Sequence, residues 1–115
     1  MIIENINNVK KDALTINGSQ GAQIQWLLSH NEGIDHFYMR YISIEPGGII
    51  PMHSHELIHE IFIVKGEGVA LSEENETKLE PGNFVYVEPN EMHGLKNTGS
   101  DTFDLICCVN KPKDK

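Results

Sequence analysis

The sequence has few basic residues, few cysteines and no long apolar run, and each shortage excludes a class of protein. It carries nine Lys and Arg residues against seventeen Asp and Glu, for a formal net charge of -8. A nucleic-acid partner is not expected, because binding phosphates needs a basic face and none can be assembled here. The same charge disfavours anionic membranes, and no apolar stretch has the length of a membrane span or a signal peptide. We therefore expect a cytoplasmic protein without a membrane partner.

The two cysteines, Cys107 and Cys108, are neighbours in an apolar run. This placement suits a reducing compartment better than a disulfide framework. At 115 residues the chain has the length of one domain and can bury one core without disulfides. We therefore treat residues 1–115 as a single domain.

Helical periodicity is also scarce, whereas apolar and β-branched runs bounded by Gly, Pro, Asn and Asp recur along the chain. This pattern predicts an all-β fold, either a sandwich or a barrel, with a double-sheet jelly roll as one option. The first twenty residues carry only weak strand signals, at 1–3 and 13–16. The expected strands are residues 22–29, 36–44, 59–66, 68–73, 83–88 and 102–109, with turns between them that include EPGG at 45–48 and EENET at 73–77.

The segment HSHELIHE contains three histidines and two glutamates in eight positions. On a β-strand, residues two apart share a face, so His53 and His55 point the same way, and His59 has the same parity. Glu56 and Glu60 have the opposite parity and would join the histidines only across a bulge. This spacing, followed by an apolar strand, favours a metal site over a solvent-exposed histidine cluster.

Two spacings in the chain resemble the motifs of small single-domain cupins. The first family motif is G(X)5HXH(X)3-4E(X)6G. Here Gly47 is followed after five residues by His53 and His55, and Gly66 follows His59 after six. His59 thus stands where the family usually has its glutamate.

The second family motif is G(X)5PXG(X)2H(X)3N, and Gly82, His93 and Asn97 match it at the expected intervals. Glu88 stands where the first Pro is usual, and Asn90 replaces the Gly, although Pro89 and Asn90 still suit a turn. The resemblance covers roughly residues 37–109 and implies a double-stranded β-helix, the cupin jelly-roll barrel. Residues 1–36 would then supply N-terminal strands.

The resemblance is to a cupin subgroup whose metal site is made of four histidines. It implies His53, His55, His59 and His93 as ligands and no glutamate. Glu60 follows His55 after four residues, which the motif allows, but five residues rather than six separate it from Gly66. One divalent metal per chain is expected. Imidazole suits Fe, Cu, Ni and Zn, and the resemblance adds Mn, so Mn and Fe are favoured while Cu, Ni and Zn stay open.

Other residues are candidates for the cavity around such a site. Arg40 lies in an aromatic and aliphatic run, where it either faces a polar cavity or pairs with a carboxylate; in the cavity it would clamp a substrate carboxylate. Cys107 is the cysteine favoured to line the cavity, against the more common buried structural thiol. Trp26 is expected in the core or an interface, and His30 and His36 at the surface. The acidic residues near the histidines, as orienting partners or as solvent-facing charge, are Glu56, Glu60, Glu88 and Glu91.

Three functions fit this reading. The first is a metal-dependent oxidoreductase, dioxygenase-like, that acts on a small organic molecule at the open positions of a four-histidine site. The second is a non-catalytic metal or small-ligand binding module, since fold does not fix chemistry. The third is a metal-assisted isomerase or lyase, which needs a proton-transfer group that the sequence does not identify. A homodimer is expected from the resemblance.

Overall fold

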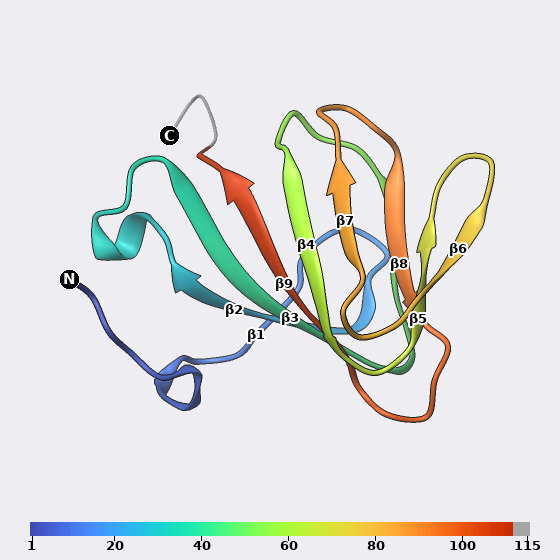
Figure 1. Cartoon of the computed structure of the whole chain (residues 1–115), viewed down its shortest axis with the longest axis horizontal. Coiled ribbons are helices and arrows are strands. Elements are labelled where there is room, and N and C mark those ends of the chain that lie inside the picture. The colour runs from blue at the N-terminus through green and yellow to red at the C-terminus, as the bar shows by residue number, and fades with distance from the viewer. Residues whose placement is uncertain (112–115) are drawn as a thin grey trace.

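The computed structural model describes residues 1–111 and shows an almost entirely β-structured chain (Figure 1). A nine-stranded sheet has the order β6-β5-β8-β3-β9-β4-β7, with β2 paired to β3 and β1 paired to β2. All of these strand pairs are antiparallel. The strands are β1 (Asp12–Ala13), β2 (Gln20–Leu28), β3 (Phe37–His53), β4 (His59–Lys65), β5 (Gly68–Leu71), β6 (Glu76–Leu79), β7 (Phe84–Val87), β8 (His93–Asn97) and β9 (Phe103–Asn110), and the 3-10 turns are η1 (Ile6–Asn8) and η2 (His30–Glu32).

The sheet curls because one long strand, β3, belongs to both of its halves. Residues 37–44 of β3 pair with β9, and residues 49–53 pair with β8. Between them the β2–β3 register jumps, so that Gln20 pairs with Ile49 while Ala22 pairs with Ile44. The prediction of a turn at EPGG is therefore wrong. Its Pro and Gly residues form a bulge at which one continuous strand bends from one half of the sheet into the other.

Two strands were missed by the sequence prediction. β6 is an edge strand whose first three residues are exposed, so it shows no alternation of apolar and polar residues. β8 begins with His93 and Gly94 and ends with Asn97, which are residues of low strand propensity. Residues 1–3 form no strand, and of the weak signal at 13–16 only Ala13 lies in one. At these places pairing with a neighbouring strand, rather than local sequence, decides the structure.

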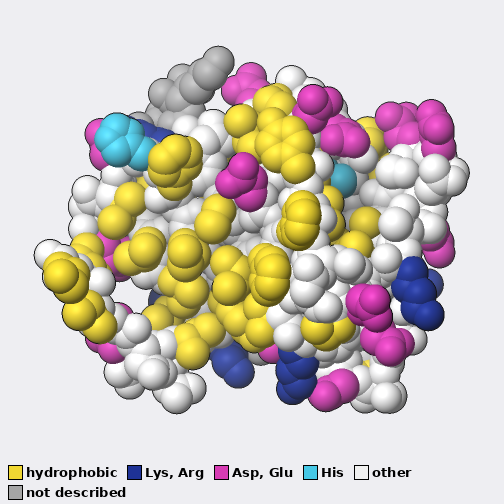
Figure 2. Space-filling view, in the orientation of Figure 1, with side chains coloured by type: hydrophobic (Ala, Val, Ile, Leu, Met, Phe, Trp, Pro, Cys, Tyr) yellow, Lys and Arg dark blue, Asp and Glu magenta, His cyan; other side chains and the backbone are white. Residues whose placement is uncertain are grey.

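The core lies between the two halves of the curled sheet. Alternate residues of β9 point inward, and Phe103, Leu105 and Cys107 are at most 1% exposed. Ile44 and Ile63 are fully buried against them. The opposite face of β4, β7 and β9 remains open to solvent and carries hydrophobic side chains, which gather on the face shown in Figure 2. No helix in residues 1–111 is long and apolar enough to cross a membrane.

The N-terminal segment is fastened to β2 by a buried side chain. Gln25 Nε2 donates hydrogen bonds to the backbone oxygens of Ile6, at 3.2 Å, and Val9, at 2.9 Å. These bonds satisfy a polar side chain that is 6% exposed. The residues before β1 therefore lie against the outer face of β2 without extending the sheet.

Candidate metal centre

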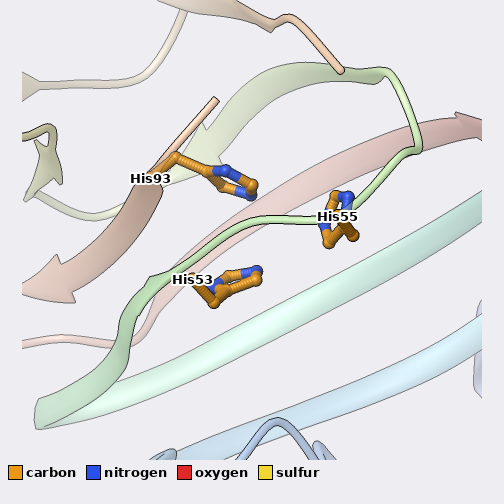
Figure 3. A group of neighbouring side chains, drawn as sticks. All are labelled: His53, His55 and His93. Carbon is orange, nitrogen blue, oxygen red and sulfur yellow. The ribbon is translucent and has the colours of Figure 1, made fainter. Parts of the chain in front are cut away.

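Histidines from both sequence motifs meet at one end of the barrel. His53 ends β3 and is paired in register with His93, the first residue of β8. His55 lies in the loop between β3 and β4. One ring nitrogen of each lies within 4.8 Å of those of the other two, and Figure 3 shows the three rings turned toward a common space. Strand pairing and a short loop thus bring together residues that are forty positions apart.

His59, the first residue of β4, is buried next to this group. Its ring stacks on that of His55 with 4.3 Å between centroids, and its centroid is 5.2 Å from that of His93. Its nitrogens lie outside the three-nitrogen group, yet His59 lines the same small internal cavity as His53 and His93. The four rings therefore form one cluster.

Each of the four histidines has one buried ring nitrogen without a hydrogen-bond partner in the described part of the chain. These atoms are Nε2 of His53, His59 and His93 and Nδ1 of His55. Leaving a buried polar atom unpaired costs about 1–3 kcal/mol, so such atoms are few in folded proteins. Four of them in one cluster, all imidazole nitrogens, fit the donor set of a bound transition-metal ion.

Backbone carbonyls orient two of these rings. His53 Nδ1 lies 2.8 Å from the Pro51 oxygen, and His93 Nδ1 lies 2.7 Å from the Glu91 oxygen. A carbonyl oxygen only accepts, so in both rings Nδ1 carries the proton and Nε2 keeps its lone pair. This is the tautomer in which Nε2 binds a metal, and the hydrogen bond from Nδ1–H to the carbonyl holds each ring in place.

A sulfur atom orients the ring of His59. Cys107 Sγ lies 3.1 Å from His59 Nδ1 and accepts a 3.0 Å hydrogen bond from Arg40 Nη2. Arg40 Nη2 is also 3.4 Å from His59 Nδ1. With His59 Nε2 turned to the cluster, Nδ1–H donates to the sulfur. Burial raises the pKa of the Cys107 thiol, which keeps it protonated despite the opposing effect of Arg40.

Burial favours the neutral form, which binds metal, in three of these histidines. Desolvation lowers the pKa of His55 and His93. For His59, desolvation and then the positive charge of Arg40 lower the pKa to about 2. Both glutamates of the HSHELIHE segment are exposed, so neither joins the cluster.

The nearby acidic side chains are exposed, which agrees with the prediction of solvent-facing charge for most of them. Backbone oxygens and Cys107 orient the rings instead. The carboxylate of Glu91 instead accepts from the Glu88 backbone N–H, and the Asn90 N–H donates to the His55 carbonyl at 2.7 Å. Carbonyl directions depend on backbone conformation, and no residue type signals them in a sequence.

A second, larger cavity opens beyond Arg40 at the same end of the barrel. Its volume is about 430 Å³, within the usual range for small-molecule sites. Trp26 is not a core residue, because it is 39% exposed and forms part of this wall. His30 and His36 are exposed, as predicted. The side chains around this outer cavity are Trp26, His30, Ile34, Asp35, Tyr38, Arg40, Leu57, Val109 and Lys111.

Comparisons with known proteins agree with this architecture. A model of the cupin domain matches residues 40–109. The chain is 26% identical over 77 residues to 1-methylthio-D-xylulose 5-phosphate methylsulfurylase of Rhodospirillum rubrum. The matching region covers 67% of this chain and 49% of that protein. It thus spans about half the length of that relative.

Solved structures give the same fold. A polyketide cyclase from Streptomyces resistomycificus superposes with a TM-score of 0.90 at 21% identity, covering 96% of this chain and 79% of the other. A cupin 2 domain-containing protein from Halorhodospira halophila has a TM-score of 0.76 at 28% identity, covering 86% and 72%. With the curled antiparallel sheet and a histidine cluster at one end, the family match shows that this chain belongs to the cupins.

Proposed function

We propose that this protein binds one divalent transition-metal ion through His53, His55, His59 and His93 and is a metal-dependent oxidoreductase for a small organic molecule. The observation that carries the proposal is the set of four unpartnered imidazole nitrogens, one from each histidine. Mn or Fe is the expected metal, with Cu, Ni and Zn as alternatives. Bound there, such an ion supplies redox chemistry and open coordination positions of the kind that dioxygenases use.

The chain's own residues define the surroundings of the reaction. Four neutral imidazoles leave the charge of an ion uncompensated, and the guanidinium of Arg40 adds a positive charge beside His59. Both effects favour an anionic or electron-rich substrate. Apolar side chains, among them Ile42, Ile61 and Leu105, surround the cluster and exclude water from it.

A second candidate is a metal-assisted isomerase or lyase, and Cys107 is the observation that favours it. Its thiol lies in the internal cavity with the histidines and keeps its proton because burial raises its pKa. It is therefore placed to give a proton to a substrate at the cluster.

Elemental analysis of the protein purified without added metal tests the ligand set. We expect about one ion per chain in the native protein and a much smaller content in the His59→Ala and His93→Ala variants. His36→Ala is the matched control, because His36 is exposed and should leave the metal content unchanged. Full metal content in His93→Ala would remove that residue from the ligand set.

Oxygen consumption by the Mn- and Fe-loaded protein, followed over a panel of small aromatic and oxygenated compounds, tests the reaction class. Uptake that disappears in His93→Ala supports an oxidoreductase. Turnover of a substrate without oxygen uptake, lost in a Cys107→Ala protein that still carries its metal ion, would replace it with the isomerase or lyase. A metal-loaded protein with neither activity would indicate a non-catalytic binding module.

A further inference from the structure

The one arginine of the chain is a buried cation that lacks a carboxylate partner. Arg40 is 9% exposed, and its Nε has no hydrogen-bond partner within residues 1–111. The ion pairs formed by the described residues do not include it. Its one firm acceptor is the sulfur of Cys107, 3.0 Å from Arg40 Nη2. A buried guanidinium without an anion is costly, so an anion is the group that would complete this site.

Arg40 also lies at the boundary between two cavities. It lines the internal cavity with the histidines and the outer cavity of about 430 Å³. Its guanidinium carbon is 5.4 Å from the ring centroid of Trp26 in the outer cavity wall. A ligand in the outer cavity would therefore have its anionic group at Arg40 and next to the histidine cluster.

The remainder of the outer cavity favours an apolar ligand body. Trp26 and Tyr38 meet edge to face, with 6.4 Å between ring centroids, and Leu57 and Val109 add aliphatic surface. The other cation of the wall, Lys111, is already paired with Asp35. One free guanidinium with apolar walls suits one carboxylate on a ring better than a polyhydroxylated phosphate, which needs several polar partners.

We propose that the outer cavity binds an aromatic carboxylate, with the carboxylate on Arg40 and the ring between Trp26 and Leu57. This inference rests on the proposed function, because it assigns the substrate class of the same site. It gives Arg40 the role of a substrate-binding residue and the aromatic walls the role of selecting the substrate body.

The one tryptophan of the chain gives a direct measurement, because Trp26 lies in the wall of the cavity. Its fluorescence is followed while benzoate, benzamide, acetate and ribose 5-phosphate are each added to the purified protein up to about 10 mM. We expect a saturable change with benzoate, at an affinity at least about tenfold higher than with the neutral benzamide or with acetate. Equal affinity for benzamide, stronger binding of ribose 5-phosphate, or no response to benzoate would each overturn the proposal.

Variants of Arg40 test whether the carboxylate of benzoate binds at this residue. Arg40→Gln should weaken benzoate binding at least about tenfold, and Arg40→Lys, which keeps the charge without the planar fork, should fall between it and the native protein. Lys65→Gln is the control, since this exposed lysine pairs with Asp101 outside the cavity. Circular dichroism checks that each variant is folded. Unchanged benzoate affinity in folded Arg40→Gln would show that the carboxylate binds elsewhere, for example at the histidines.

The same samples separate this proposal from the metal proposal. Metal content is measured beside fluorescence in the native protein and in His93→Ala. A benzoate response in a protein that contains no metal would contradict the metal site but not the carboxylate site, and it would support the role of Arg40. A metal-containing protein that gives no response to benzoate would contradict the proposed aromatic carboxylate site but not the metal site.

Discussion

Two adjacent cysteines show how strand alternation divides residues between a site and a surface. Cys107 is 1% exposed and accepts hydrogen bonds in the histidine cluster, whereas Cys108 points to the other face of β9. Because Cys107 holds the His59 ring through Nδ1, we predict that Cys107→Ala lowers metal affinity about 10- to 100-fold. Cys108→Ala is the matched control and should leave the affinity unchanged. Competition with a chelator of known affinity measures both, and equal affinities in the two variants would refute the orienting role.

Tyr41 gives a residue-scale prediction for pH. Burial, and then its 2.8 Å hydrogen bond to Asp104 Oδ2, raise the Tyr41 pKa from 10.0 to about 12. A raised pKa means that the stability contributed by this group is complete below pH 10 and is lost as the pH rises through about 12. Phenolate absorbance should show a late-titrating phase, and Tyr41→Phe should remove that phase. A variant that retains it would assign the raised pKa to another tyrosine.

At the scale of elements, turns depend on backbone positions that only some residues tolerate. Gly66, between β4 and β5, has φ +83, and a Cβ there would be 2.1 Å from the Thr102 oxygen. Gly47, in the bulge of β3, has φ +79 with open space around it. We predict that Gly66→Ala costs about 3–4 kcal/mol of unfolding free energy and Gly47→Ala about 1–2. Urea denaturation measures both losses, and similar values would show that the contact with Thr102 relaxes freely.

The turn before β8 shows what the sequence could and could not predict. Asn90, at the position where the family has Gly, adopts φ 66, which Asn tolerates better than most residues. The motif spacing was therefore a better guide than the residue identity. By contrast, local propensity predicts neither β6 nor β8 and predicts a turn at EPGG, because strand pairing across the sheet overrides local propensity there. The Pro51 and Glu91 carbonyls that orient the rings have no sequence signal at all.

At the scale of the whole molecule, the outer face formed by β4, β7 and the first residue of β3 is unusually apolar for a surface. Phe37, Phe62, Phe84 and Tyr86 are 72, 48, 82 and 56% exposed. At about 200 Å² per aromatic side chain they expose roughly 500 Å², close to the largest patches of monomeric proteins. Stable dimers bury about 800 Å² on each partner, so this face supplies most of the area that a dimer interface needs. Figure 2 shows hydrophobic side chains gathered on this face.

We therefore predict that the protein is a homodimer that uses this outer face. Phe84→Asp should convert it to a monomer with little loss of monomer stability, because Phe84 is 82% exposed and contributes little to the core. Thr77→Asp, on the exposed edge strand β6, is the control and should remain dimeric. Sedimentation velocity at about 1 to 100 µM distinguishes the two states. Since the histidine cluster and the outer cavity open at the end of the barrel, metal content and benzoate binding should survive in the Phe84→Asp monomer. A native protein that sediments as a monomer throughout this concentration range would contradict the prediction of a homodimer.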